Sequence, residues 1–462
     1  MFTHHRSILR TGLCLVLSLS ILPVLPGILS AVTAEAAAPK PSASAPAKEA
    51  PGAKAVPVKQ APDKMDVMAK EAPVSGPIRS VCLTWPVVPG AVQYQVVLLK
   101  SAEDTPANIA LTQDQVFTTG LEVDLSRFGS KAADFYWKVC PLDYDGKAIG
   151  SLSEPKPVAE ATLNPSAPVP TTQFEQMDFM PMYPVYSWIP TPGAKFHEVQ
   201  VWRAKTFEDK LIRTLQAGEY DIYEDGGYTL PGKYYWRVRS TTEDGTPTSD
   251  WSIRVPFTVT EKAQIAALGD SITHGGGVMS VPPGYTTYDW ETYAPVPVKN
   301  LGFSGNTTAD MLERFDRDVL PLHPQVLVIM GGVNDYRTGI MGSETVVHLA
   351  EIRDRCEAAG IIPVFMTVTP INPSLFHRAG IETPPTDWLV HQQYINHWVM
   401  EQKYSVDVST MLTDGVGCLR RDYTTDGLHP DYFGKKYIGE TVGQYIQKHF
   451  PVLCSFLKKK QA

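Results

Sequence analysis

Cysteine is scarce in this chain, with six residues in 462, and no two of them form a Cys-x-x-Cys pair. Structural zinc sites need closely spaced thiolates, so the sequence predicts no metal site. Five cysteines follow the N-terminal apolar segment, and an odd number at wide spacing defines no disulfide framework. A single disulfide is compatible with the sequence, which does not select its pair. Cys356 shares an apolar helical stripe with Leu349 and Ile352, so we expect it in a core.

Charged residues are also few, at 19% of the chain, and the formal net charge is -8. Nucleic acids and anionic membranes are bound by clustered Lys and Arg, and the one basic run in this sequence is Lys458–Lys460. We expect that run to be a solvated tail and predict no nucleic-acid partner. At 462 residues with 43% hydrophobic content, the chain is long enough for about two to four domains with cores of their own.

Long apolar runs are absent after the N-terminus. Basic residues up to Arg10 precede an apolar stretch from Leu13 to Val32, and small residues follow at Ala34 and Ala36. This order predicts an export signal over 1–36 that is cleaved after one of these alanines. An uncleaved anchor is the alternative, but two prolines interrupt the stretch. We therefore expect a secreted or cell-envelope protein with no stable membrane span after cleavage.

Residues 37–76 are rich in Ala, Pro, Lys and Ser and predict a flexible linker. An internal repeat follows the linker. Leu-Thr-Trp at 83–85 and Tyr-Trp-Lys-Val at 136–139 recur as Tyr-Ser-Trp at 186–188 and Tyr-Trp-Arg-Val at 235–238. Short alternating runs between Gly and Pro turns predict two antiparallel sandwiches, over 77–163 and 164–260.

The repeated positions resemble fibronectin type III modules, which implies a role as spacers or docking surfaces. Four tryptophans stand at these positions: Trp85, Trp137, Trp188 and Trp236. Stacking on sugars is one interpretation, but alternate strand positions favour packing in a core.

After Thr258 the pattern changes to longer apolar runs separated by helical segments, which is typical of an α/β domain with a parallel sheet. The expected strands are 265–268, 326–330 and 361–368. A helix is expected over Glu344–Ala359, ended by Gly360, and a closing helix over Tyr432–His449. We predict a doubly wound parallel sheet over 261–452, followed by a basic tail over 453–462.

Polar clusters stand after the expected strands, and ligands of open α/β sheets bind at the carboxyl ends of strands. In Gly-Asp-Ser-Ile-Thr at 269–273, Ser271 can present its hydroxyl at a strand-to-helix junction, although a helix cap is the plain alternative. Gly305, within 300–308, allows close approach of a ligand to a backbone N–H, or simply marks a turn. Asn334, within 331–335, can donate to a developing negative charge, or serve as a buried structural residue.

The fourth cluster, 426–430, supplies a carboxylate and an imidazole three residues apart. In a tight turn Asp426 can accept the N–H of one ring nitrogen of His429 while the other ring nitrogen faces Ser271. The alternative is that Asp426 and His429 form an ordinary pair on the surface, without a catalytic role. The occurrence of all four clusters in one domain favours catalysis.

These four blocks resemble the SGNH hydrolases, also called GDSL esterases and lipases, over about 263–450. The resemblance implies Ser271 as nucleophile, His429 as base and Asp426 as its orienting acid. It also implies an oxyanion hole formed by Ser271, Gly305 and Asn334, with no metal and no cofactor. The first block has Ile where the family name has Leu, and 273–299 is richer in Gly and Pro than the helix usual in the family.

We therefore expect a secreted serine esterase that acts through an acyl-enzyme, on O-acetyl or other short acyl groups of glycans. A lysophospholipase or thioesterase is an alternative, and so is a carbohydrate-binding adhesion protein with an inactive hydrolase domain. An α/β-hydrolase is disfavoured because no Gly-x-Ser-x-Gly elbow is present. Aromatic residues in expected loops either shape a sugar site or pack within the domain: Tyr285, Tyr288, Trp290 and Trp388.

Overall fold

The computed structural model describes residues 78–172, 174–260, 262–277, 281–457 and 459, all within one unit that spans 63–462. The expected export signal and linker lie outside the described residues. Among the helices of these described ranges, none has the length and apolar character needed to cross a bilayer.

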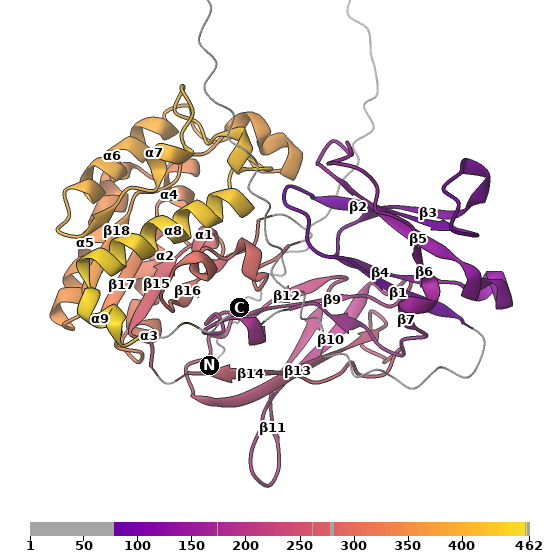
Figure 1. The fold of residues 1–462 in the computed structure, drawn as a ribbon. Coiled ribbons are helices and arrows are strands. Elements are labelled where there is room, and N and C mark those ends of the chain that lie inside the picture. The colour runs from indigo at the N-terminus through magenta and orange to yellow at the C-terminus, as the bar shows by residue number, and fades with distance from the viewer. Residues whose placement is uncertain (1–77, 173, 261, 278–280, 458, 460–462) are drawn as a thin grey trace, which may run out of the picture. The chain divides into compact units, whose positions relative to one another are not determined.

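The first β-region contains two antiparallel sheets, ordered β4-β1-β7 and β3-β2-β5-β6 (Figure 1). Its strands are β1 (Ser80–Thr84), β2 (Gln93–Leu99), β3 (Ile109–Val116), β4 (Gly120–Asp124), β5 (Tyr136–Leu142), β6 (Lys156–Pro157) and β7 (Thr162–Leu163). Alternate residues of these strands are buried in one apolar core. Trp85 and Trp137 both belong to it, with ring centroids 6.2 Å apart.

The second β-region repeats this arrangement, with sheets ordered β12-β9-β8 and β11-β10-β13-β14. Its strands are β8 (Val169–Pro170), β9 (Val185–Ile189), β10 (Phe196–Arg203), β11 (Lys210–Ala217), β12 (Asp221–Tyr223), β13 (Gly232–Thr241) and β14 (Val255–Val259). Trp188 and Trp236 are fully buried in its core. The four repeated tryptophans are therefore core residues. Two regions of three plus four antiparallel strands are consistent with fibronectin type III modules, which remain a prediction.

A five-stranded sheet, ordered β16-β15-β17-β18-β19 and parallel throughout, forms the third region. Its strands are β15 (Ile265–Gly269), β16 (Lys299–Gly302), β17 (Val326–Met330), β18 (Ile362–Met366) and β19 (Ser405–Val406). The helices around it are α1 (Ser271–His274), α2 (Thr308–Glu313), α3 (Phe315–Asp318), α4 (Val333–Arg337), α5 (Gly342–Ala358), α6 (Trp388–Met400), α7 (Ser409–Leu412), α8 (Tyr432–His449) and α9 (Pro451–Ser455). Helix α8 runs across one face of the sheet (Figure 1). The predicted parallel α/β fold is confirmed.

The boundaries of the predicted elements differ mainly at β18. The apolar run 361–368 is trimmed at both ends because its outer residues have other partners. Ile361 N–H donates to Cys356 O (2.8 Å) in the turn that ends α5, and Val368 N–H donates to the side chain of Asn396 (2.6 Å). Gly360 has φ +71°, as its predicted role at the end of the helix requires.

The C-terminal tail is not fully solvated. Helix α9 crosses the position at which the tail was expected to begin, and Leu453 and Leu457 pack against the core of the parallel-sheet region. Lys459 donates through Nζ to the backbone oxygens of Thr292 and Ala294. The expectation of a solvated basic run is therefore wrong for Lys459, because its ammonium group donates hydrogen bonds to loop carbonyls.

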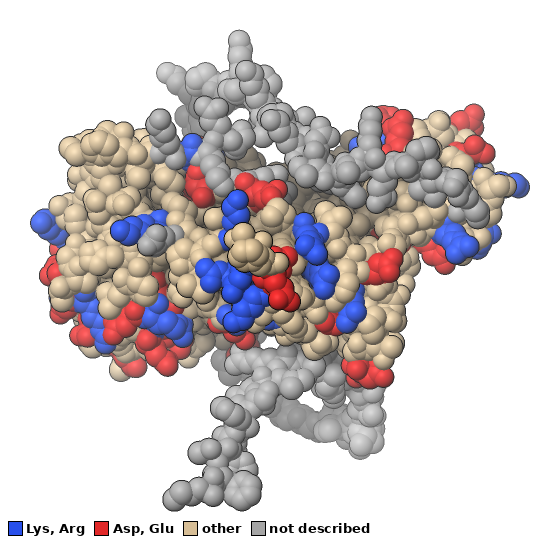
Figure 2. Space-filling model, turned by 90° about the horizontal axis from the view of Figure 1, so that it is seen from below, with Lys and Arg blue, Asp and Glu red and all other residues tan. Residues whose placement is uncertain are grey.

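The described cysteines are all free thiols: Cys82, Cys140, Cys356, Cys418 and Cys454. Cys356 is fully buried in the core, as predicted. On the face shown in Figure 2, basic and acidic side chains lie among one another, so this face has no large area of one sign.

Candidate active site

The proposed nucleophile stands where β15 passes into α1. Asp270 caps α1, and its carboxylate accepts the N–H of Ile272 (2.9 Å), which fixes the turn that carries Ser271. A Cβ on Gly269 would lie 2.8 Å from Met330 O and closer still to Thr273, so only glycine fits this junction. Burial raises the pKa of Asp270 to about 6.

The fourth cluster forms a tight turn before α8. Asp426 Oδ1 accepts the backbone N–H groups of Leu428 (2.7 Å) and His429 (2.8 Å). Gly427, at φ +87°, is required because a Cβ there would lie 2.3 Å from Asn372 O. Thr424 completes the turn, since its Oγ1 accepts the N–H of Gly427 (2.9 Å).

Ser271, His429 and Asp426 lie in one hydrogen-bonded chain. His429 Nδ1 lies 2.7 Å from Asp426 Oδ2, and His429 Nε2 lies 2.9 Å from Ser271 Oγ. Burial acts to raise the pKa of Asp426, but the charge of His429 and the hydrogen bonds outweigh burial and hold the pKa below its ordinary value. Because an ionised carboxylate only accepts, Nδ1 carries the proton and Nε2 is free to accept from the Ser271 hydroxyl.

Gly305 and Asn334 are brought together at the carboxyl ends of β16 and β17. Gly305 is exposed, has φ +87°, and would present a Cβ to open space. Asn334 is buried, and its Nδ2 donates to Asn306 O (2.8 Å), beside Gly305. Arg337 Nε donates to Asn334 Oδ1 (3.0 Å), which fixes the orientation of the amide. One N–H of Nδ2 remains for a ligand.

Asp335, next to Asn334, holds the start of α2. Its carboxylate accepts the N–H of Thr308 (3.0 Å) and the hydroxyl of Thr345 (3.3 Å). Burial raises its pKa, and these hydrogen bonds oppose the rise. Asp335 thereby fixes the chain that follows the Gly305 turn.

A buried lysine that our sequence analysis did not identify supports the nucleophile helix. Lys435 of α8 is fully buried, and its Nζ donates to Ile272 O (2.5 Å). Burial lowers its pKa to about 8, against the opposing charges of Asp289, Glu291 and Asp270. Burial also raises the pKa of Asp289 to about 7 and that of Glu291 well above its ordinary value. The charge of Lys435 opposes the rise in the pKa of each of these carboxyl groups.

The loop aromatics do not line an open sugar site. Tyr285, Tyr288 and Trp290 are buried, the first two in a cluster with Val92 of the first β-region. Trp388, expected in a loop, is the first residue of α6 and packs against the core. The packing interpretation is therefore the correct one.

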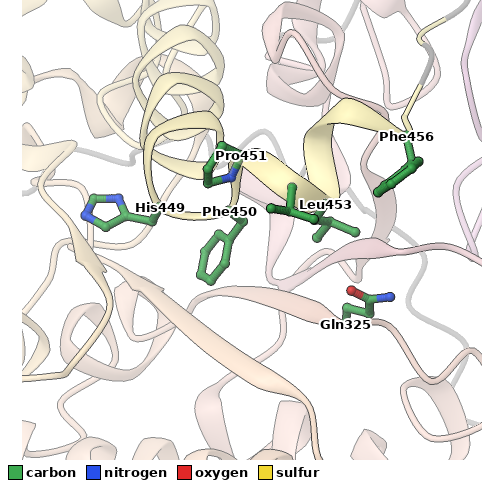
Figure 3. Close-up of a pocket in the computed structure, with 7 residues that line it drawn as sticks. Gln325, His449, Phe450, Pro451, Leu453 and Phe456 are labelled. Atoms are coloured by element: carbon green, nitrogen blue, oxygen red, sulfur yellow. The ribbon is translucent and has the colours of Figure 1, made fainter.

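Among the described residues, no group of three or more His, Cys, Asp or Glu could hold a metal ion. A surface pocket of about 450 Å³ is lined by residues that include Gln325, His449, Phe450 and Leu453 (Figure 3). Gln325 directly precedes β17, so this pocket lies at the amino ends of the strands, whereas Ser271 follows a carboxyl end.

A serine, a histidine and an aspartate in this geometry, at the carboxyl edge of a parallel sheet, define the class of serine hydrolases. Residues 267–436 match the GDSL-like lipase/acylhydrolase family. This part of the chain is a GDSL-like (SGNH) acylhydrolase domain, and the protein is a serine ester hydrolase of that type.

Solved structures with similarity to the chain include a lipase/acylhydrolase from Enterococcus faecalis, with 21% identity and TM-score 0.34, over 43% of this chain and 98% of the other. A GDSL-like lipase from Bacteroides thetaiotaomicron has 21% identity and TM-score 0.33, over 42% and 93%. A catalytic mutant of an acetylxylan esterase from Geobacillus stearothermophilus has 18% identity and TM-score 0.31, over 40% and 95%. No curated protein matches the chain. At these identities and TM-scores, the substrates of the solved proteins do not transfer to this chain.

Proposed function

We propose that Ser271 is the nucleophile of an exported esterase that removes short acyl groups from glycans. The observation that carries the catalytic part is the chain from Asp426 through His429 to Ser271, with contacts of 2.7 and 2.9 Å. Ser271 Oγ attacks the ester carbonyl carbon while its proton passes to His429 Nε2. Asp426 stabilises the imidazolium that results.

The oxyanion of the tetrahedral intermediate is bound by the N–H groups of Ser271 and Gly305 and by Asn334 Nδ2. Collapse of the intermediate expels the alcohol, which takes the proton from His429. A water molecule then attacks the acyl-enzyme, with His429 again as base, and the carboxylic acid leaves.

Two features support a short acyl group and a polar alcohol. The aromatic residues of the loop after the nucleophile are packed within the fold, so they are not free to line a channel for a long chain. The half-buried guanidinium of Arg337 lies beside Asn334 and offers further N–H donors to hydroxyl groups of a sugar. The N-terminal segment 1–36 supports export.

Labelling with a fluorophosphonate tests the nucleophile. Wild-type protein should be labelled and should hydrolyse p-nitrophenyl acetate, whereas Ser271→Ala should do neither. Ser343→Ala, which changes an exposed serine of α5, is the matched control and should behave as wild type. Labelling retained in Ser271→Ala would place the nucleophile elsewhere.

Acyl-chain preference tests the substrate class. We expect a higher kcat/KM for acetyl than for octanoyl p-nitrophenyl esters, and release of acetate from an acetylated polysaccharide. A clear preference for octanoyl esters would favour a lipid hydrolase instead. N-terminal sequencing of the protein recovered from outside the cytoplasm tests export, and a start at residue 1 would contradict signal cleavage.

A further inference from the structure

A short arm of the second β-region runs along the edge of the parallel sheet. The arm consists of residues 180–183, between β8 and β9, and it borders edge strand β16. Met182 N–H donates to Asn300 O (2.9 Å), and Lys299 Nζ donates to Met180 O (2.5 Å). Met182 and Tyr183 are fully buried within the core of the parallel-sheet region. The second β-region is therefore built into that region.

The arm reaches the Gly305 turn through one imidazole. His274, the last residue of the nucleophile helix α1, has Nε2 2.5 Å from Tyr183 O. Its Nδ1 accepts the backbone N–H of Ser304 (3.2 Å), and the Ser304 hydroxyl lies 2.9 Å from the same atom. Because a backbone N–H can only donate, Nδ1 is unprotonated, and Nε2 carries the proton that Tyr183 O accepts. Burial lowers the pKa of His274 to about 4, so the ring is neutral.

A second route runs through the Tyr183 hydroxyl. The hydroxyl donates to Asp318 Oδ2 (2.6 Å), which also accepts from Arg314 Nη1 (3.0 Å). Arg314 then donates through Nε to Asn306 Oδ1 (2.6 Å) and through Nη2 to Gly269 O (2.9 Å). Tyr183 is thus connected to Ser304 and to Asn306, the two residues that flank Gly305.

We propose that the 180–183 arm positions the oxyanion-binding turn, with His274 as the positioning residue that joins Tyr183 to Ser304. This inference rests on the proposed function, in which the N–H of Gly305 binds the oxyanion. Gly305 has a positive φ and lies in a turn closed by the hydrogen bond from Asn306 N–H to Phe303 O (3.2 Å), so the direction of its N–H depends on how that turn is held. The residues on either side must fix it, and displacement by fractions of an ångström weakens oxyanion binding. The second β-region therefore acts in catalysis, beyond the role of spacer or docking surface that the sequence suggested.

His274→Asn in the full chain is the decisive variant. The Asn Oδ1 occupies about the position of Nδ1 and can still accept from Ser304, but nothing reaches Tyr183 O. We expect kcat for p-nitrophenyl acetate to fall roughly tenfold to a hundredfold, with KM within about twofold of wild type. The midpoint of the pH–rate profile should not move, because the contacts of His429 are untouched. Circular dichroism and a thermal melt establish that the variant is folded at the assay temperature.

Tyr183→Phe is a milder second variant, and it decides the test if His274→Asn does not fold. It removes only the hydroxyl that contacts Asp318, and kcat should fall several-fold. Tyr186→Phe is the matched control, because this buried tyrosine, three residues on, bonds to Tyr228 within the β-region (3.0 Å). Its kcat should equal that of wild type.

Wild-type kcat in the variants at 274 and 183, or an equal loss of kcat in Tyr186→Phe, would overturn the inference. A shift of the pH–rate midpoint would overturn it too, because the effect would then act on His429. Absence of hydrolysis by the wild type would instead refute the proposed function, on which the inference rests.

Discussion

Asn334 is the one proposed oxyanion donor that is a side chain, so it can be removed without change to Ser271 or His429. Its amide is fixed from both sides, by Asn306 O at 2.8 Å from Nδ2 and by Arg337 Nε at 3.0 Å from Oδ1. Asn334→Ala removes the remaining N–H and leaves the two backbone donors in place. The variant therefore removes one oxyanion donor, together with its contact to Asn306 O beside Gly305, and leaves Ser271 and His429 in place.

The expected magnitudes form a series. Loss of one preorganised oxyanion donor costs about 3 to 4 kcal/mol, so Asn334→Ala should lower kcat roughly 10²- to 10³-fold. Asn334→Asp keeps the shape but places a carboxylate near the developing charge, and like charges about 4 Å apart repel by roughly 4 kcal/mol at an effective dielectric constant near 20. It should be slower still. Arg337→Met frees only Oδ1 and should cost about 1 kcal/mol, or about fivefold.

Steady-state hydrolysis of p-nitrophenyl acetate measures the series, and thermal melts verify that each variant is folded. KM should stay near the wild-type value, because the ground-state carbonyl bears little charge. A kcat of Asn334→Ala within about threefold of wild type would refute the assignment of this donor. An Asp variant faster than the Ala variant would refute the electrostatic reasoning.

Three further predictions concern the turn before α8 and two buried bases. Gly427→Ala forces a Cβ to within 2.3 Å of Asn372 O at φ +87°, so kcat and melting temperature should both fall, and normal values would contradict the turn geometry. Lys435→Met removes a positive charge that favours the ionised form of Asp289 and other buried carboxyls, so the folded variant keeps their protons to higher pH, whereas the unfolded chain releases them. The loss of melting temperature should therefore be larger at pH 8 than at pH 6, and equal losses would contradict this. The pKa of His274 is lowered to about 4, so below about pH 6.5 the unfolded state binds a proton that the folded state does not. The free energy of unfolding should therefore decrease from pH 6.5 towards pH 4 by up to about 1.4 kcal/mol per pH unit. Denaturant titration across this window should show a smaller decrease in His274→Asn.

The strands that could be predicted from the sequence are those made of continuous apolar residues. β15 and β17 are continuous apolar runs because helices or loops cover both of their faces. Edge strand β16 gave no such signal, since it begins with Lys299 and Asn300 and is nevertheless buried. The 180–183 arm explains this burial, because Met180 O accepts from Lys299 Nζ and Met182 N–H donates to Asn300 O. No local pattern could reveal a partner more than a hundred residues away.

The residues of the candidate site also fall into two groups, those that could be predicted from the sequence and those that could not. Ser271, Gly305, Asn334, Asp426 and His429 could be proposed from sequence because each stands in a short block with its own glycine or carboxylate. The residues that orient them could not, since their partners come from distant elements. His274 and Lys435 carry no spacing signal, and their roles depend on Tyr183 O and Ile272 O, which only the folded chain brings within reach. Burial of a polar side chain becomes informative once its partner is known.

The loop after the nucleophile shows why the β-regions and the sheet depend on one another. The described stretch 281–298 forms no α-helix against which Tyr285 and Tyr288 could pack. The first β-region provides partners instead, since the Tyr285 hydroxyl lies 3.2 Å from Thr119 Oγ1 and the Tyr288 hydroxyl accepts the N–H of Gly90 (3.4 Å). The second β-region contacts the site through Tyr183, whose backbone oxygen lies 2.5 Å from His274 Nε2. Both β-regions therefore supply contacts to the parallel-sheet region, the first to the loop that carries Tyr285 and Tyr288 and the second to His274 at the end of α1.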